Sequence, residues 1–319
     1  MKKNVFTMLL CCAVTIISCN GKQNQTQAST AVVDAPESTV TEKESYDFEA
    51  LAKAIEGSTY LYMLDNGVIS MDKGDERFYI DLQGHILDSL PEEEVDPNAL
   101  KARYKDGAYG FVDANDKLVI PYQYDFACDF SDGMALVIND PGLVGYINTK
   151  GELVIPYQFD HPSESNGNDF HEGLCAVVVD GEHEWFSYID KTGKLAFPGV
   201  FSHAGDFSEG LAVVTLTGEK YQGGYIDHSG EMAITLPEGW WGRKFHDGVA
   251  QTLKYDSCFV IDKTGKRLFQ VNRDIVYTGN EIVYSHGLAV VIGKGKYEHV
   301  WGLMDKKGRI TFCLDEKDN

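Results

Sequence analysis

The stretch FSEGLAVV at residues 207–214, followed by GYIDHSG at residues 224–230, decides the fold of this chain. Both parts recur. The first is an aromatic-x-x-Gly-x-Ala motif, which starts at Phe130, Phe170, Phe207, Phe245 and Tyr284, with Cys175 inserted before the Ala in the second copy. The second is an apolar pair followed by Asp-x-x-Gly, and its Asp or Asn is found at Asp81, Asp113, Asn148, Asp190, Asp227, Asp262 and Asp305. The copies lie 32 to 43 residues apart, so the sequence predicts a tandem repeat.

Each repeat is predicted to hold three or four short antiparallel strands. In Asp-x-x-Gly, the carboxylate can accept backbone N–H groups two or three residues on, and Gly takes a positive φ at little cost. The chain then turns back into an apolar strand such as residues 153–155. Pro156 should end the pairing of that strand because proline has no N–H. The run at residues 211–214 predicts a further strand, buried on both faces.

The expected fold class is therefore all-β, and two arrangements can house such units. We favour a β-propeller-like arrangement, in which the partial units at the two ends combine into one closing blade. The alternative is an open β-solenoid, in which each unit touches only its neighbours.

The repeats resemble the bacterial WG repeat, a β-repeat family named for a Trp-Gly pair before the apolar-Asp strand. The segment Trp301-Gly302-Leu303-Met304-Asp305 matches most literally, and residues 207–212 also resemble the family. Elsewhere the Trp is replaced, as at Tyr109-Gly110. The resemblance spans about residues 78–314 and implies a repeat scaffold without a common chemistry.

The N-terminus has the pattern of an export signal. Lys2 and Lys3 precede an apolar run of about 13 residues, too short to span a bilayer. The run ends in Ile-Ile-Ser-Cys, which resembles a bacterial lipobox. Residues 1–18 are therefore predicted to be a lipoprotein signal peptide, with Cys19 as the lipidated residue. Because no acidic residue follows Cys19 directly, we expect an outer-membrane anchor that faces the periplasm.

Three further segments complete the predicted organisation. Residues 19–45 hold the lipidated Cys and a polar tether, expected to be disordered. Residues 46–77 are predicted to form a short helix and a first strand region, because Phe48, Leu51, Ala52 and Ile55 follow helical spacing. Residues 78–319 are the β-repeat domain.

The charge balance limits the classes of partner. The chain holds 28 basic and 49 acidic residues, a formal net charge of −21. Such a chain has no basic surplus to neutralise phosphates, so we expect no nucleic acid partner and no basic membrane-binding face. Membrane association is expected through the lipid anchor alone.

No catalytic or metal-binding motif is present, so no catalytic residue, metal or cofactor is expected. His171, His246 and His286 lie near repeated positions and could share a metal in a closed ring, but we favour exposed turn residues. We interpret the repeated Asp residues as turn caps rather than calcium ligands. One repeated carboxylate position, a poor setting for an acid/base pair, is occupied by Asp132, Glu172, Glu209 and Asp247.

Trp240 and Trp241 interrupt the repeat pattern and are the candidate binding residues. One of them could be exposed and stack on a sugar or a partner side chain, while core packing of both is the simpler interpretation. The repeat domain also holds four cysteines, for which three disulfide pairings or free thiols remain open: Cys128, Cys175, Cys258 and Cys313.

These features favour a non-enzymatic cell-envelope lipoprotein whose β-repeat domain binds another envelope protein or a glycan. The alternatives are a glycan-active hydrolase with its site in a propeller channel, and a purely structural envelope spacer. The sequence does not identify the ligand.

Overall fold

A computed structural model of the protein describes residues 45–90, 96, 99–139, 142–161, 169–218 and 222–314. The predicted signal peptide, Cys19 and the tether up to residue 44 lie outside the described residues. The segment Glu44–Asn319 forms one compact unit. None of the helices in the described ranges is both long and apolar enough to span a membrane.

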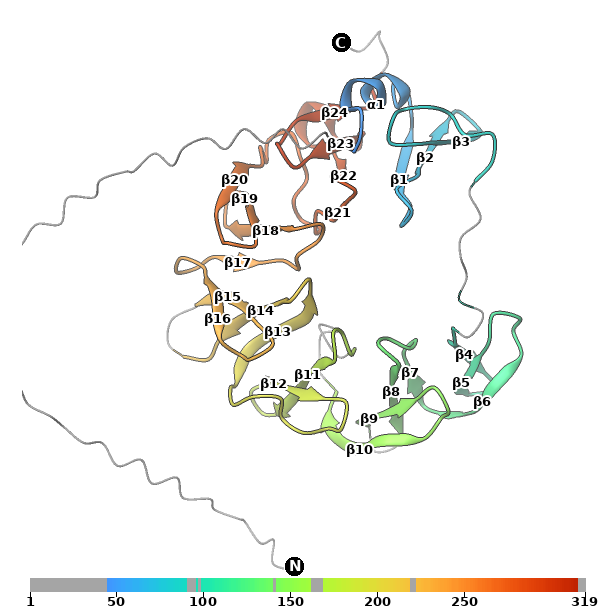
Figure 1. Ribbon diagram of the computed structural model, residues 1–319, viewed down its shortest axis with the longest axis vertical. Helices are drawn as coiled ribbons and strands as arrows, with labels where there is room; N and C mark the ends of the chain where they lie inside the picture. The colour runs from blue at the N-terminus through green and yellow to red at the C-terminus, as the bar shows by residue number, and fades with distance from the viewer. Residues whose placement is uncertain are drawn as a thin grey trace, which may run out of the picture. The chain divides into compact units, whose positions relative to one another are not determined.

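The fold is all-β, as predicted, and its strands pair antiparallel throughout (Figure 1). The first sheet contains β1 (Tyr60–Met63), β2 (Ile69–Lys73) and β3 (Glu76–Ile80). The next contains β4 (Lys101–Lys105), β5 (Ala108–Val112) and β6 (Leu118–Tyr124). The last two contain β17 (Trp241–Gly242), β18 (Val249–Lys254), β19 (Ser257–Asp262) and β20 (Arg267–Gln270), then β21 (Tyr284–Ser285), β22 (Leu288–Ile292), β23 (Trp301–Asp305) and β24 (Ile310–Phe312).

The middle repeats are joined into one continuous ladder. It contains β7 (Phe126–Ala127), β8 (Met134–Asn139), β9 (Leu143–Asn148), β10 (Leu153–Asp160), β11 (Leu174–Asp180), β12 (Trp185–Asp190), β13 (Phe201–Ser208), β14 (Leu211–Leu216), β15 (Gly223–Ile226) and β16 (Met232–Thr235). Single residue pairs bridge successive repeats, at Asp160 with Val178 and at Phe186 with Phe201. Each repeat therefore keeps its own short strands and still hydrogen-bonds to the next.

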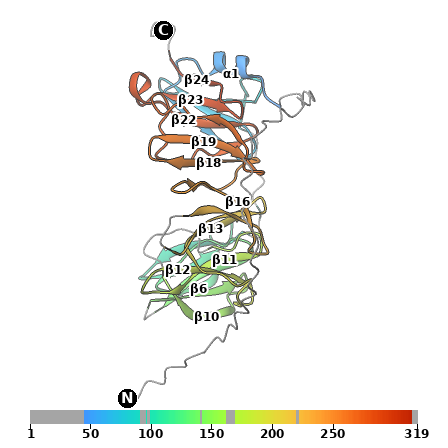
Figure 2. The same ribbon diagram turned by 90° about the vertical axis from the view of Figure 1, so that its left-hand side faces the viewer.

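A short helix packs at the start of the domain. α1 (Phe48–Ala54) begins after Asp47, whose carboxylate accepts the N–H of Ala50 at 3.0 Å. Phe48, Leu51 and Ile55 are buried, as the helical spacing predicts. Their neighbours in the core include residues of the last sheet, and α1 lies beside β23 and β24 in both ribbon views (Figure 1 and Figure 2). A 3₁₀ turn, η1 (Gly295–Tyr297), is the other helical element of the described residues.

The first and last sheets are in contact. Leu61 and Ile69 of the first sheet share a buried cluster with Leu288 and Leu303 of the last. The two ends do not merge into one blade as expected, because each forms a sheet of its own. Their contact is nevertheless the one that a propeller-like arrangement requires, whereas the ends of an open solenoid stay apart.

The Asp-x-x-Gly turns have one geometry in all seven copies. The Asp or Asn Oδ1 accepts the N–H two residues on at 2.8–3.0 Å and the N–H four residues on at 2.8–3.2 Å. The sequence predicts hydrogen bonds from the N–H groups two or three residues on, whereas the structure has them from the N–H groups two and four residues on. The fourth residue of each turn has a positive φ, and in one copy it is Asp116 (φ 57°) instead of Gly. The repeated Asp residues are therefore turn caps.

The glycines of these turns also form the contact between repeats. A Cβ at Gly151, Gly193 or Gly265 would lie 2.9–3.2 Å from Ile120, Ile155 or Ile234 of the preceding repeat. At Gly230 it would lie 2.3 Å from Phe197. The apolar residue that precedes Pro in several repeats therefore packs onto the turn glycine of the next repeat.

Pro156 does not end its strand, contrary to the sequence-based expectation. β10 runs on to Asp160, and its register with β9 shifts between Ile155 and Phe159. Since proline offers no N–H to the ladder, the strand bulges at this point and then resumes pairing. β6 contains Pro121 and shows the same kind of shift.

Aromatic pairs fill the space between successive repeats. In each, the aromatic residue before an Asp turn meets the first residue of the next aromatic-x-x-Gly motif, with ring centroids 4.8–5.2 Å apart. Such tilted and edge-on pairs stabilise by about 0.5–1.5 kcal/mol beyond their buried area. The pairs are Phe111–Phe130, Tyr146–Phe170, Tyr188–Phe207 and Tyr225–Phe245.

The four cysteines of the repeat domain are free thiols. Burial raises the pKa of Cys128 to about 11 and that of Cys313 to about 12. Burial also raises the pKa of Cys175 and Cys258. A thiol with a raised pKa carries little thiolate at neutral pH, so these residues act as small core side chains.

Replacing Gly230 by Ala should destabilise the domain more than replacing Gly133 by Ala. The two glycines have φ of 83° and 76°, so an Ala at either costs about 1–2 kcal/mol of backbone strain. Only at Gly230 does the new Cβ overlap a neighbour, Phe197, which adds about 1–3 kcal/mol. Urea unfolding measures both free energies, and equal values for the two variants would contradict the packing role of the glycine.

Asp227→Asn should destabilise the domain at pH 7 and have little effect near pH 2.5. Hydrogen bonds from the Ser229 hydroxyl, then from backbone N–H groups, hold the pKa of Asp227 below its usual value. The stabilisation by the charged carboxylate is present above the unfolded pKa of about 3.9 and is lost as the pH falls through the folded value. Urea unfolding between pH 7 and pH 2.5 measures the gap to the parent. A gap that stays constant would contradict the prediction, and Asp75→Asn, whose carboxylate has no hydrogen bond in the described chain, is the control.

Candidate binding site

Four acidic residues sit in tight turns that join neighbouring repeats. Each is followed by a Gly, and both residues have φ between 50° and 87°, as a two-residue type I′ hairpin turn requires. Each carboxylate accepts the N–H of the turn glycine in the next repeat at 2.5–3.3 Å. We call these the acid-Gly turns, and their acceptor and donor residues are Asp132 with Gly173, Glu172 with Gly210, Glu209 with Gly248, and Asp247 with Gly287.

The same carboxylates also meet a lysine or histidine side chain. It follows the Asp of the next repeat's Asp turn, and its nitrogen lies 2.8–3.2 Å from the carboxylate. In chain order these side chains are Lys191, His228, Lys263 and Lys306. Each acidic residue is therefore engaged in a separate contact between repeats.

The three candidate histidines do not come together. His171 Nε2 lies 3.5 Å from Asp206 Oδ2, and His246 Nε2 lies 3.8 Å from Glu281 Oε1. The ring of His286 lies against Gly67 of the first sheet. Within the described ranges, no group of three or more His, Cys, Asp or Glu side chains could hold a metal ion.

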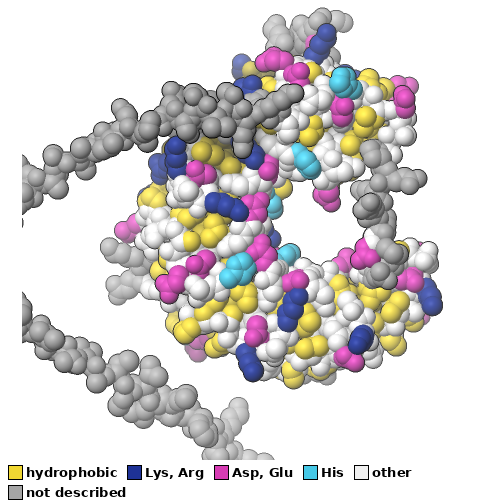
Figure 3. Space-filling view, in the orientation of Figure 1, with side chains coloured by type: hydrophobic (Ala, Val, Ile, Leu, Met, Phe, Trp, Pro, Cys, Tyr) yellow, Lys and Arg dark blue, Asp and Glu magenta, His cyan; other side chains and the backbone are white. Residues whose placement is uncertain are grey.

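A small charged network links two of these repeats. Asp206 Oδ2 lies 2.8 Å from Lys244 Nζ, and Asp206 Oδ1 is buried without a hydrogen-bond partner among the described residues. Burial, reinforced by the charge of Asp206, raises the pKa of Asp169. Figure 3 shows acidic and His side chains interspersed on the visible face of the described domain. The charges of Asp206 and Lys244 compensate each other, so the network carries little net charge.

Trp240 and Trp241 are both half-buried and pack into different clusters. Trp240 packs against the cluster that contains Tyr225 and Phe245, and Trp241 against the one that contains Leu253. The Arg267 guanidinium lies 4.7 Å from the Trp240 ring centroid and covers one of its faces. Neither ring lines any of three cavities in the described part of the chain, and a better-formed candidate site is found on the first sheet.

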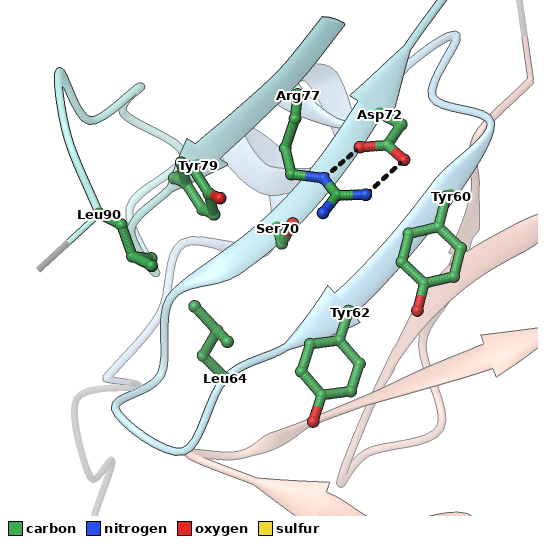
Figure 4. Close-up of a pocket in the computed structure, with 8 residues that line it drawn as sticks. All are labelled: Tyr60, Tyr62, Leu64, Ser70, Asp72, Arg77, Tyr79 and Leu90. Atoms are coloured by element: carbon green, nitrogen blue, oxygen red, sulfur yellow. Dashed lines mark hydrogen bonds and ion pairs between the residues drawn. The ribbon is translucent and has the colours of Figure 1, made fainter. Parts of the chain in front are cut away.

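That site is a cavity of about 440 Å³ on the first sheet (Figure 4). We call it the tyrosine cavity. Its volume lies within the range of about 300–1,000 Å³ that is typical of small-molecule sites. Its lining residues are Tyr60, Tyr62, Leu64, Ser70, Asp72, Arg77, Tyr79 and Leu90.

The register of the first sheet explains why these side chains gather. Tyr60 pairs with Asp72, which pairs with Arg77, so these three form one row across β1, β2 and β3. Tyr62, Ser70 and Tyr79 form the next row on the same face. The residues between them, such as Leu61 and Ile69, point to the opposite face and are fully buried.

The tyrosine cavity lies where a tyrosine has no aromatic partner in the described part of the following repeat. Tyr79 precedes the Asp turn at Asp81 and so corresponds to Tyr146, Tyr188 and Tyr225, which each meet an aromatic ring of the following repeat. Tyr79 has no such ring partner among the described residues. Its ring therefore borders the cavity instead of filling a contact between repeats.

A smaller second cavity of about 240 Å³ adjoins the tyrosine cavity. Tyr60 and Tyr62 line both cavities, and Tyr277, Asn280 and Trp301 line the second. The rings of Tyr60 and Trp301 meet edge-on with centroids 4.8 Å apart, which holds Tyr60 in place. The aromatic side chains that line the two cavities thus form one continuous surface.

The repeat motifs do not point to these residues, although the sequence carries a signal for them. Residues 60–64 can be recognised as a possible strand. The alternation of Tyr60 and Tyr62 with Leu61 and Met63 further indicates one apolar face and one tyrosine face. Tyr62 is 52% exposed and Tyr60 36%, so the tyrosine face is the outward one.

The comparison with protein families supports the repeat assignment. The profile described as "WG containing repeat" matches residues 109–140, 145–182 and 186–221, so the chain contains three WG repeats. The resemblance inferred from the sequence motifs is confirmed for this part of the chain. No curated protein matches the chain significantly.

Several solved structures resemble the chain at low identity. The computationally designed Ika8 protein is 13% identical with a TM-score of 0.45, and the match covers 80% of this chain and 86% of that one. BamB from Moraxella catarrhalis is 13% identical with a TM-score of 0.44, covering 79% and 86%. Hsv2p from Kluyveromyces lactis is 7% identical with a TM-score of 0.44, covering 82% and 98%.

Removing one acid-Gly carboxylate should weaken the contact between two repeats. In Glu209→Ala, the Gly248 N–H and the Lys263 ammonium lose their acceptor, so we expect a loss of about 1–2 kcal/mol in the free energy of unfolding. Asp106→Ala is the matched control, because Asp106 occupies the same kind of turn (φ 53°) but its carboxylate has no partner among the described residues. Equal losses in urea unfolding would show that the contact adds nothing.

Proposed function

We propose that this chain is a non-enzymatic lipoprotein of the bacterial cell envelope whose β-repeat domain binds another protein or a glycan. Cys19 carries the lipid, the polar segment at residues 20–45 is a tether, and the compact unit from Glu44 onward is the binding domain. The absence of acidic residues directly after Cys19 supports an outer-membrane anchor that faces the periplasm.

One observation carries the binding role. The repeats fill their mutual contacts with aromatic pairs and ion pairs, but the tyrosine face of the first sheet stays open. Exposed aromatic side chains in a concave site favour binding, because they offer a large apolar area and a polar hydroxyl at little entropic cost.

The two alternatives make different demands. A glycan-active hydrolase needs two carboxylates at one place in different environments. The repeated carboxylates instead occupy separate contacts, each with its own Gly N–H and cation. A structural spacer needs no distinctive open surface, and the tyrosine face argues against it.

Two measurements test the proposal. The full chain should sediment with the envelope, and Cys19→Ala should shift it to the soluble fraction because the acyl anchor is lost. The immobilised unit from residue 44 onward should retain an envelope protein or glycan saturably, with an unrelated acidic domain as control. An unchanged location of Cys19→Ala would contradict the anchor. Failure to retain any partner would favour the spacer or the hydrolase.

A further inference from the structure

We propose that the tyrosine cavity and the adjoining second cavity together bind a neutral oligosaccharide, with neighbouring sugar rings in the two cavities. The inference rests on the proposed binding function and names its ligand class. It assigns the site to the first and last sheets rather than to Trp240 and Trp241.

The aromatic lining supplies the flat apolar surfaces that sugar rings stack on. Tyr60 and Tyr62 project from the same face of β1, and Tyr79 projects from β3 across the cavity (Figure 4). Each tyrosine has an apolar ring and a polar hydroxyl, which suits a ligand with apolar C–H faces and a polar rim. Because Tyr60 is held by Trp301, little ordering is needed when a ring stacks on it.

The polar lining suits hydroxyl groups. The Ser70 hydroxyl lies among the lining side chains and is 5% exposed, and it has no hydrogen-bond partner in the described chain. A ligand hydroxyl that fills the cavity can supply that partner. Asn280 adds an amide, which both donates and accepts, at the second cavity.

The charged lining disfavours an anion, because it consists of Asp72 and Arg77 in the tyrosine cavity and of Glu281 in the second cavity. Arg77 Nε and Nη2 donate to the two Asp72 oxygens at 2.7 and 3.0 Å, so the ion pair neutralises itself. The hydrogen bond from Arg77 lowers the pKa of Asp72, which remains an ionised acceptor. An anionic ligand would have to displace Asp72 and approach a chain of net charge −21. A sugar needs only the remaining Arg77 N–H groups and the Asp72 lone pairs.

We predict more than one sugar subsite. Tyr60 and Tyr62 line both cavities, so a ligand can contact these two side chains from either cavity. Tyr277 lines only the second cavity, and Tyr79 lines only the first. Affinity should therefore rise from the monosaccharide to the disaccharide or trisaccharide.

The test is calorimetric titration of the full-length chain with defined oligosaccharides of one to six glucose, xylose or N-acetylglucosamine units. Oligogalacturonates of the same lengths are the anionic probe. At least one neutral series should bind, with the trisaccharide about tenfold tighter than the monosaccharide, and the anionic probe should bind more weakly.

Matched variants locate the site. Tyr62→Ala should weaken binding about tenfold, and Tyr62→Phe, which keeps the ring, should stay within about twofold of the parent. Tyr277→Ala should weaken the trisaccharide but leave the monosaccharide unchanged. Tyr255→Ala is the control, because Tyr255 is 80% exposed and lines neither cavity. Thermal unfolding shows that each variant is folded.

Each of the other possible results of these titrations and retention experiments would overturn one part of the proposal. Neutral oligosaccharide binding that survives Tyr62→Ala would overturn the site and leave the proposed binding function standing. Retention of an envelope protein but of no oligosaccharide would overturn the ligand class alone. Equal or tighter binding of oligogalacturonates would overturn the charge argument. Failure to retain any partner would overturn both this inference and the proposed function.

Discussion

The structure depends on one kind of contact between neighbouring repeats. A turn carboxylate of one repeat accepts the glycine N–H of the next repeat and also meets a Lys or His side chain of that next repeat. The strands are only two to eight residues long, and a single repeat cannot bury its apolar surface alone. The acid-Gly turns fix the spacing between repeats at one end of the strands. The aromatic pairs and the turn glycines pack across the same boundaries between repeats.

The sequence predicts what is local in this fold. The Asp turns, the positive φ of their glycines and the short helix follow from residue types at fixed spacing, and the structure contains them. Contacts between repeats could not be predicted in the same way. Glu209 contacts Gly248 and Lys263, which lie 39 and 54 residues further along the chain, and only the stacking of sheets brings them together. The effect of Pro156 was mispredicted because a bulge absorbs the missing N–H without ending the strand.

The candidate site was harder to predict because it depends on a contact that is missing. Tyr79 matches its equivalents in sequence, and nothing local shows that its ring has no partner in the described structure. Trp240 and Trp241 are an unusual pair in the sequence, and their rings pack against two different clusters. Their role in binding stays a prediction, whereas the open aromatic surface of the first sheet is made of tyrosines.

The direction of the acid-Gly contact has a consequence for how such a chain can change over generations. The repeats that hold Glu172, Glu209 and Asp247 each carry an acceptor for the repeat that follows, and a Gly N–H with a Lys or His side chain for the repeat that precedes. A gene duplication that copies one whole repeat therefore supplies both halves of the new joint, and the flanking joints need no compensating mutation. A deletion that removes part of a repeat leaves a carboxylate facing no donor. The number of repeats in such a chain should thus change by the gain or loss of whole repeats.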